Sequence, residues 1–557
     1  MIICKLDKGI GLRSRNPDTL EIEEREVSFN EFRPYFFVRK NDRNLSNEYF
    51  VIKDKWGNCR ITITSEEGDY RNLDGEELVK VSWTPNHPRY GYKLRDMFEE
   101  SYEADVQMHY RYAIDEIEEI VEYKMRKWYW DMEWMQGGEH DGAITCISMY
   151  DNYDEEYTTY AWYPDETYKQ ISSENTPEAT LFSSEKKMLV AFLSDVIDKD
   201  PDMLISWFGW KFDLPKLIER MVWNVIDPRL LSPFNELTGV SWRNGSPTYS
   251  PNIYEYSPVN QPIKGRICVP LDMAFERQWN DSQRGTLPSM ALDYVAEMVL
   301  GEKKLTSEKF PDKNEFFARG WLEDAETYLE YARIDVELLV RIDEMQHTTE
   351  AILSLQRLLR APFDACFYAS NMGGIYFMRN ASWKAPTGRK GERASYDGAM
   401  VYDPLSEGTN GLHLGVAAFD FAGLYPSMAV ARNISWETKS EEPTEFAVNV
   451  KTPKDFSDVT QEQMRYFKTD ELGLLPKAVL ELKQLRNEYK KRMKEATSES
   501  EYTKWNNNQL AVKRLSASFY GIVAYQGFGW ADVELAECIT ASAREAIRSA
   551  AFKAREL

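Results

Sequence analysis

The stretch WYWDMEWM at residues 128–135 alternates large apolar side chains with the two acids Asp131 and Glu133. Alternation with a period of two predicts a β-strand. Residues two apart in a strand point to the same face, so both carboxylates would project into one site. Paired carboxylates offer the oxygen ligands that Mg²⁺ and Mn²⁺ prefer, although a lone DxE pair is more often two solvated surface acids.

Two later segments carry further acids in patterned positions. Asp213 follows the strand-like LISWFGWKF and precedes the helical LPKLIER, where an Asp most often caps the helix. In YLEYARIDVELL, Tyr331 and Asp335 are four residues apart and therefore share one face of a predicted helix. Taken singly, each feature is weak, so their order along the chain matters more than any one of them.

The surrounding sequence predicts a multidomain α/β and α+β protein. Strands are predicted at 127–135, 143–150 and 202–209, and helices at 185–197 and 324–346. We therefore expect an α/β domain over residues 106–345. A β-rich N-terminal domain is predicted at 1–105, joined by a mainly helical stretch at 346–385.

The DxE strand, the FD before a helix and the YxxxD helix together resemble the three exonuclease motifs of family B DNA polymerases. The later stretches YDGAMV, FAGLYPSM and AECITASARE resemble archaeal and viral members of this family more than bacterial ones. The resemblance implies an RNase H-like 3′→5′ exonuclease domain that hydrolyses DNA with two Mg²⁺ or Mn²⁺ ions. Its metal ligands would be Asp131, Glu133, Asp213 and Asp335, and Tyr331 would orient the attacking water. The family's usual Asn before FD is replaced here by Phe208 or Gly209, which affects primer-end binding.

A second set of motifs resembles the polymerase region of the same family. SYDGAMVYDP (395–404) is similar to the YxGG/A element, and VAAFDFAGLYPSMAVARNIS (416–435) is similar to the first polymerase motif. We expect a strand and a sharp turn over 414–428. By resemblance Asp420 binds both metals, Phe421 joins the metal set, and Leu424 and Tyr425 contact the nucleotide.

Two long helices are predicted at 476–497 and about 503–520, the first with a stripe of Lys483, Arg486, Lys490 and Lys494. The second resembles the family's fingers motif, with Ala517 in place of its Asn. The resemblance implies that Arg486 and Lys513 meet the incoming triphosphate and that Tyr520 packs on the nascent base pair. Palm segments are expected at 386–470 and 522–557, with fingers at 471–521.

The DTD hairpin that completes the polymerase metal site in this family is absent from the 557 residues, as is the thumb. One acid is not enough for a two-metal reaction. We therefore expect a large subunit that needs a second polypeptide carrying DTD and thumb, acting on primer–template DNA and dNTPs, with a sliding clamp as a candidate partner. The alternatives are a stand-alone exonuclease with a vestigial polymerase region, a non-catalytic DNA-binding scaffold, and a shortened piece of a longer chain.

The amino-acid composition excludes few functions. Six scattered cysteines and five histidines show no metal-binding spacing. No signal peptide or apolar run of membrane-spanning length is present, which predicts a cytoplasmic, nucleoid-associated protein of a prokaryote or a virus-infected cell. The formal net charge of −23 fits nucleic-acid binding poorly, but a basic strip can lie on an acidic body.

Overall fold

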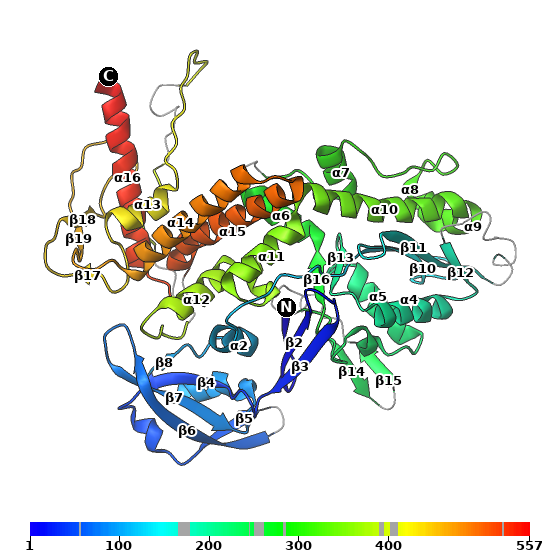
Figure 1. Ribbon diagram of the computed structural model, residues 1–557, viewed down its shortest axis with the longest axis horizontal. Coiled ribbons are helices and arrows are strands. Elements are labelled where there is room, and N and C mark those ends of the chain that lie inside the picture. Colours follow the sequence, from blue (N-terminus) through cyan, green and yellow to red (C-terminus); the bar gives the residue numbers. More distant parts are fainter. Residues whose placement is uncertain are drawn as a thin grey trace. The chain divides into compact units, whose positions relative to one another are not determined.

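The computed structural model describes residues 1–54, 57–164, 167, 179–243, 246–249, 261–281, 286–388, 395–400, 410–525 and 529–556. The chain divides into two compact units, and each unit is built from two separate stretches of the sequence. The first unit contains Met1–Ser28 and Ile117–Phe367, and the second contains Phe29–Glu116 and Tyr368–Leu557. Both units mix helices and strands, which confirms the predicted α/β character (Figure 1).

The strands of the first unit are β1 (Ile2–Lys5), β2 (Gly9–Arg15), β3 (Ile22–Ser28), β9 (Lys127–Trp134), β10 (Ile144–Asp151), β11 (Glu156–Trp162), β12 (Ala179–Phe182), β13 (Met203–Ser206), β14 (Val240–Arg243), β15 (Ser246–Tyr249) and β16 (Ile267–Pro270). Its helices are α4 (Glu185–Lys199), α5 (Asp213–Trp223), α6 (Leu271–Asp281), α7 (Leu292–Leu300), α8 (Lys313–Glu315), α9 (Trp321–Glu323), α10 (Ala325–Gln346) and α11 (Thr348–Leu359). The predicted strands at 127–135 and 143–150 and the helices at 185–197 and 324–346 are thereby confirmed, whereas the strand predicted at 202–209 is limited to Met203–Ser206.

The main sheet of this unit has the order β12-β11-β10-β9-β13-β16 among the described strands. β10 runs antiparallel to β9 and β11, whereas β9, β13 and β16 are parallel to one another. Figure 1 shows α10 along one face of this sheet and α4 with α5 along the other. A sheet covered on both faces explains why the strands are so apolar.

Strand β9 sends alternate side chains to opposite faces of the sheet. Trp128 and Trp130 are buried, and each ring centroid lies 6.2 Å from that of Phe192 on α4. Tyr129 points the other way and donates a hydrogen bond of 2.6 Å from its hydroxyl to Asp343 on α10. Asp131 has the same parity as Tyr129, so the fold directs it toward α10.

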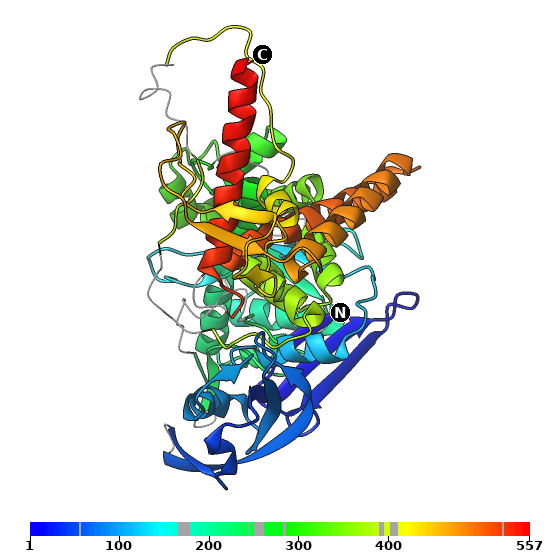
Figure 2. The ribbon, with the colours of Figure 1, turned by 90° about the vertical axis from the view of Figure 1, so that its left-hand side faces the viewer.

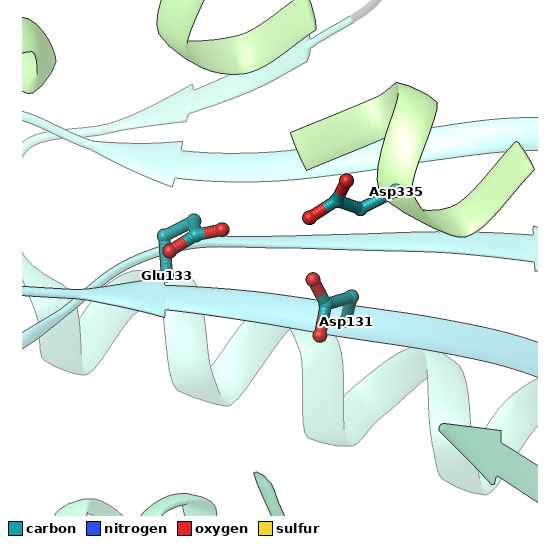
Figure 3. A group of neighbouring side chains, drawn as sticks. All are labelled: Asp131, Glu133 and Asp335. Carbon is teal, nitrogen blue, oxygen red and sulfur yellow. The ribbon is translucent and has the colours of Figure 1, made fainter. Parts of the chain in front are cut away.

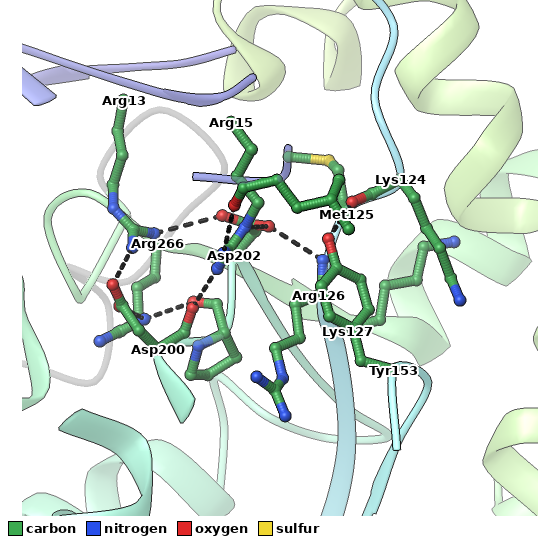
Figure 4. A network of polar contacts seen from close by, with 12 residues as sticks. Arg13, Arg15, Lys124, Met125, Arg126, Lys127, Tyr153, Asp200, Asp202 and Arg266 are labelled. Carbon is green, nitrogen blue, oxygen red and sulfur yellow. Dashed lines mark hydrogen bonds and ion pairs between the residues drawn. The ribbon is translucent and has the colours of Figure 1, made fainter. Parts of the chain in front are cut away.

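A buried ionic network fastens the β1–β3 sheet to the main sheet of the same unit (Figure 4). Asp202 accepts hydrogen bonds from Arg15 Nε at 2.7 Å and Arg13 Nη1 at 3.3 Å. Arg13 also contacts Asp200, and Arg266 pairs with the same Asp200 at 2.6 Å. Because each guanidinium has a carboxylate partner, the burial of these charges is compensated.

The second unit contains β4 (Tyr35–Arg39), β5 (Phe50–Asp54), β6 (Gly57–Arg71), β7 (Glu77–Thr84), β8 (Ser101–Tyr102), β17 (Lys439–Ser440), β18 (Phe446–Asn449) and β19 (Met464–Phe467). Its helices are α1 (Gly91–Leu94), α2 (Met108–Glu116), α12 (Ala369–Asn380), α13 (Leu424–Ala431), α14 (Leu474–Glu495), α15 (Glu499–Ala524) and α16 (Val533–Glu556). The described strands form sheets of order β5-β6-β7-β4-β8 and β17-β19-β18.

The two long helices predicted in this unit are confirmed as α14 and α15, which lie side by side (Figure 2). The last helix, α16, is held by a fully buried arginine. Arg544 donates hydrogen bonds to the carbonyls of Asp397, Gly398, Val450 and Thr452 at 2.6–3.0 Å. One side chain thus joins α16 to two loops of the same unit.

The prediction of a strand within residues 414–428 is wrong. Residues 410–421 have no regular secondary structure, and the turn leads directly into α13. Apolar side chains of this segment are exposed, with Leu412 at 89% and Phe419 at 94%. A strand needs a neighbour to satisfy its backbone groups, and no described strand of the unit pairs with this segment.

No helix in the described residues is long and apolar enough to cross a membrane.

Candidate active site

Three acids that are far apart in the sequence converge in the first unit. Asp131 and Glu133 lie on β9, and Asp335 lies on α10. One carboxylate oxygen from each lies within 4.8 Å of the other two (Figure 3). The cluster forms because strand parity turns both β9 acids toward the helix that covers that face, as the sequence predicts for Asp131 and Glu133.

The fourth predicted acid, Asp213, is adjacent but outside this group. It is the first residue of α5 and is buried. Burial raises its pKa to about 7, and the charge of Asp272 adds to the effect. Asp213 lies near enough to raise the pKa of Asp131. The structure therefore gathers three of the four predicted ligands and leaves the fourth beside them.

The cluster is electrostatically unfavourable without a cation. Burial raises the pKa of Glu133 to about 8, with the charge of Asp335 as the next cause. Burial likewise raises the pKa of Asp131 well above its ordinary value, followed by the charges of Asp213 and Asp335. Like charges held together in a buried place disfavour ionisation, and a bound cation would relieve them.

Lys304 is a member of the site that the sequence patterns missed. Its Nζ lies 2.5 Å from Asp335 Oδ2 and donates a hydrogen bond of 3.1 Å to the hydroxyl of Tyr331. Burial works against its charge, but Asp335 and Tyr331 raise the pKa of the ammonium overall. Its position in GEKK, between the second and third acidic motifs, carries no periodic signal, because the segment 301–304 is not part of a helix or strand.

The donor set fits a divalent metal. All the ligands are carboxylates, which suit Mg²⁺ or Mn²⁺. The buried Oδ1 atom of Asp335 has no hydrogen-bond partner among the described residues and remains available as a ligand. Lys304 supplies a single positive charge to several acids, so further positive charge from a bound cation would be favourable in this site.

The residues predicted to bind metal in the second unit do not form a comparable cluster. Asp420 and Phe421 lie in the exposed segment before α13, and the described residues contain no second group of three potential ligands. Leu424 begins α13 after Gly423, whose φ of 63° lies in the left-handed region that favours glycine. The predicted metal site at Asp420 is thus unformed within the described residues.

Two predicted nucleotide-binding tyrosines do meet. Tyr425 of α13 and Tyr520 of α15 stack with ring centroids 4.7 Å apart and an interplanar angle of 9°. The hydroxyl of Tyr520 lies 3.1 Å from that of Tyr396. Two side chains that separate sequence motifs predicted at the nucleotide site are therefore in direct contact.

The helical pair α14–α15 also carries the predicted basic face. Arg486 lowers the pKa of Lys490, together with burial and the charges of Lys494 and Lys513. Arg486 donates a hydrogen bond of 3.2 Å from Nε to Gln509 Oε1 on α15. The stripe on α14 and Lys513 on α15 therefore share one positive field, suited to a polyphosphate.

Comparison with known families agrees with both sets of motifs. The model of the exonuclease domain of DNA polymerase family B matches residues 130–267, and the model of DNA polymerase family B matches residues 370–554. The chain belongs to DNA polymerase family B.

Archaeal relatives of this family B chain align along most of it. The DNA polymerases of Pyrococcus glycovorans and Thermococcus gorgonarius are each 27% identical over 93% of the chain. The DNA polymerase of Desulfurococcus sp. (strain Tok) is also 27% identical over 93% of it. The chain spans about 63% of the length of the first two relatives.

The two ranges matched by the family models contain most, but not all, of the candidate site residues. The exonuclease range contains Asp131, Glu133 and Asp213 but ends before Tyr331 and Asp335. It is the fold that places Asp335 against β9. The polymerase range contains all of the predicted nucleotide-binding residues, which are Leu424, Tyr425, Arg486, Lys513 and Tyr520.

Proposed function

We propose that this chain shortens DNA from its 3′ end, as a proofreading exonuclease. The observation that carries the proposal is the convergence of Asp131, Glu133 and Asp335 within 4.8 Å, in a region similar to the family's exonuclease domain. Asp213 is the fourth ligand in this proposal, since its charge already acts on Asp131 and raises the pKa of that carboxyl.

Each acid and its neighbours would have a separate role in the hydrolysis of DNA. Divalent ions held by these acids would supply an activated water and would stabilise the leaving 3′ oxygen. Asp131 and Glu133 would hold the ions from strand β9, and Asp335 would hold them from α10. Tyr331 orients the attacking water through its hydroxyl, which Lys304 fixes by a hydrogen bond of 3.1 Å.

We further propose that the second unit takes part in template-directed DNA synthesis. Asp420, with the backbone of Phe421, would bind metal, and Leu424 and Tyr425 would contact the incoming nucleotide. Arg486 and Lys513 would neutralise the triphosphate, whose charge grows on the leaving pyrophosphate. The stacked pair of Tyr425 and Tyr520 supports a nucleotide site between α13 and α15.

We infer that synthesis requires a second carboxylate from outside these 557 residues, carried with a thumb by a partner polypeptide. The exposed, unpaired segment at 410–421 supports this, since an added strand would both pair its backbone and cover Leu412 and Phe419. An unpaired segment beside Asp420 is also what a stand-alone exonuclease with a vestigial polymerase half would show, so that function remains the second candidate.

A gel assay of a 5′-labelled primer–template with Mg²⁺ and four dNTPs tests these proposals on the chain alone. We expect the primer to shorten and not to lengthen. Lengthening would show that the chain supplies its own second carboxylate. Failure to shorten would sink the exonuclease assignment.

Matched variants separate the two activities. Asp131→Ala with Glu133→Ala should abolish shortening while DNA binding is largely kept. Asp420→Ala should leave shortening unchanged, since Asp420 belongs to the other compact unit. Extension by the Asp420→Ala variant in the presence of a partner would contradict the polymerase assignment.

A further inference from the structure

A cavity in the first unit lies between the segment 120–127, which leads into β9, and the helix α11. Its volume is about 390 Å³. Cavities of roughly 300–1,000 Å³ are typical of small-molecule sites in proteins. All of its lining residues belong to the first unit, and none of them is one of the four acids of the proposed exonuclease. The cavity is therefore a second candidate site, made of residues that the exonuclease does not use.

The charged side chains that line the cavity are three cations and two acids. Lys127 Nζ lies 2.8 Å from Glu350 Oε1, which is a close ion pair. Arg357 Nη2 lies 3.5 Å from Glu122 Oε1, a longer and weaker contact. Each acid therefore has one cation as its partner, and the charge of the third cation, Lys124, is left over in the wall of the cavity.

Lys124 is placed to bind an anion. It is exposed, and its ammonium lies 5.2 Å from the centroid of the Tyr153 ring rather than beside a carboxylate of the described residues. A cation–π contact at an exposed position is weak, so an anion can compete with it. Figure 4 shows Lys124 and Lys127 extending to the same side, away from the network of Asp200 and Asp202. In a chain with a net charge of −23, this positive charge is a local feature of the cavity.

The same cavity has an apolar wall that is held in place by hydrogen bonds. Ile120, Met125 and Leu353 line it and are buried. The side chain of Asn152 accepts a hydrogen bond of 2.7 Å from the amide of Lys127 and donates one of 3.0 Å to the carbonyl of Met125. A wall that is fixed before the ligand arrives loses little entropy on binding. The cavity therefore offers a cationic side and a preorganised apolar side.

We propose that this cavity binds a small phosphomonoester that carries a ring, in the size class of a nucleoside monophosphate. The phosphate pairs with Lys124 and Arg357, and the ring lies against Ile120, Met125 and Leu353. A phosphomonoester carries a charge of about −1.5 to −2 at pH 7, which suits one unpaired cation together with a second that is only loosely paired. The inference goes beyond the proposed exonuclease function and does not depend on it.

The test is isothermal titration calorimetry on the full chain carrying Asp131→Ala and Glu133→Ala, in EDTA, so that no nucleotide binds through metal at the acid cluster. Three probes are compared, which are thymidine monophosphate, thymidine and inorganic phosphate. We expect thymidine monophosphate to bind, and inorganic phosphate to bind at least about 5-fold more weakly, because it buries no ring against the apolar wall. Thymidine should give no detectable heat, because it lacks the charge that the cations require.

Variants of the cationic side locate the binding. Adding Lys124→Ala should raise the Kd for thymidine monophosphate at least about 10-fold, because a hydrogen bond between charged groups is lost. Lys124→Arg keeps the charge and should retain most of the affinity, whereas Arg357→Gln should weaken binding as Lys124→Ala does. Lys186→Ala is the matched control, because Lys186 is exposed on α4 and does not line the cavity. Thermal melts check that each variant is folded.

Absence of binding by thymidine monophosphate would overturn the inference, as would equal affinity in Lys124→Ala and its parent. Equal binding of thymidine and thymidine monophosphate would refute phosphate recognition, and equal binding of inorganic phosphate and thymidine monophosphate would refute the place assigned to the ring. None of these outcomes bears on primer shortening, because the variant measured lacks two of the exonuclease acids. Failure of the unmutated chain to shorten a primer would, conversely, leave this site standing.

Discussion

Lys304 Nζ lies 2.5 Å from Asp335 Oδ2, so an ammonium group occupies the edge of a cluster of one buried and two half-buried carboxylates. This pair joins the segment after α7 to the middle of α10. Lys304 therefore supplies part of the positive charge that the acids require, and a divalent metal would supply the rest.

Replacing Lys304 by Ala should destabilise the protein more strongly in EDTA than in Mg²⁺ or Mn²⁺. Removing one partner of a buried ion pair costs about 3 kcal/mol, and a bound metal would offset part of this loss. Thermal melts under both conditions measure the difference. Lys303→Ala is the matched control, because that side chain is 65% exposed and should have little effect. An equal fall in Tm with and without metal would argue against a shared charge-balancing role.

Removing divalent metal should lower the Tm of the unmutated chain and stop primer shortening. A metal present at a hundred times its Kd stabilises a protein by about 2.7 kcal/mol. Titration of Mg²⁺ or Mn²⁺ into EDTA-treated protein, followed by thermal melting, measures the effect. The gain should disappear in Asp131→Ala with Glu133→Ala and persist in Glu139→Ala, an exposed acid outside the cluster. Persistence in the double variant would place the metal elsewhere.

Replacing Asp202 by Ala should destabilise the first unit by about 3–5 kcal/mol, because it leaves the buried guanidinium groups of Arg13 and Arg15 without their shared partner. Denaturant unfolding measures the loss. It should change little between low and high salt, since buried pairs are poorly screened. Glu24→Ala removes a partly exposed partner of Arg13 and should cost less than about 1 kcal/mol. Similar losses for both variants would mean that burial does not set the strength of the network.

Replacing Arg544 by Met should destabilise the second unit by about 3 kcal/mol, because four backbone carbonyls lose their hydrogen-bond donor. Hydrogen exchange should rise locally at residues 397–400 and 448–452. Arg555→Met, an exposed position on the same helix, is the control. Unchanged exchange in these two loops would contradict the anchoring role of Arg544.

Much of the site could be predicted from local patterns. The alternation in WYWDMEWM placed Asp131 and Glu133 on one face of a strand, and β9 has that form. The spacing of Tyr331 and Asp335 placed both on one face of a helix, now α10. Family resemblance pointed to Tyr425 and Tyr520 separately, and their rings are stacked. The prediction of a strand within 414–428 was wrong, because strand pairing depends on a neighbour that local sequence does not reveal.

The sequence by itself determined which residues share a face of a strand or helix, because the backbone repeats every two or 3.6 residues whatever surrounds it. Only the tertiary structure decided that Asp335, about 200 residues beyond Asp131, meets the β9 acids, and that Lys304 joins them from an irregular segment. It also decided that Asp213 lies beside the cluster and that residues 410–421 stay unpaired. Such contacts depend on how sheets and helices pack over long sequence separations, and no local period encodes that packing.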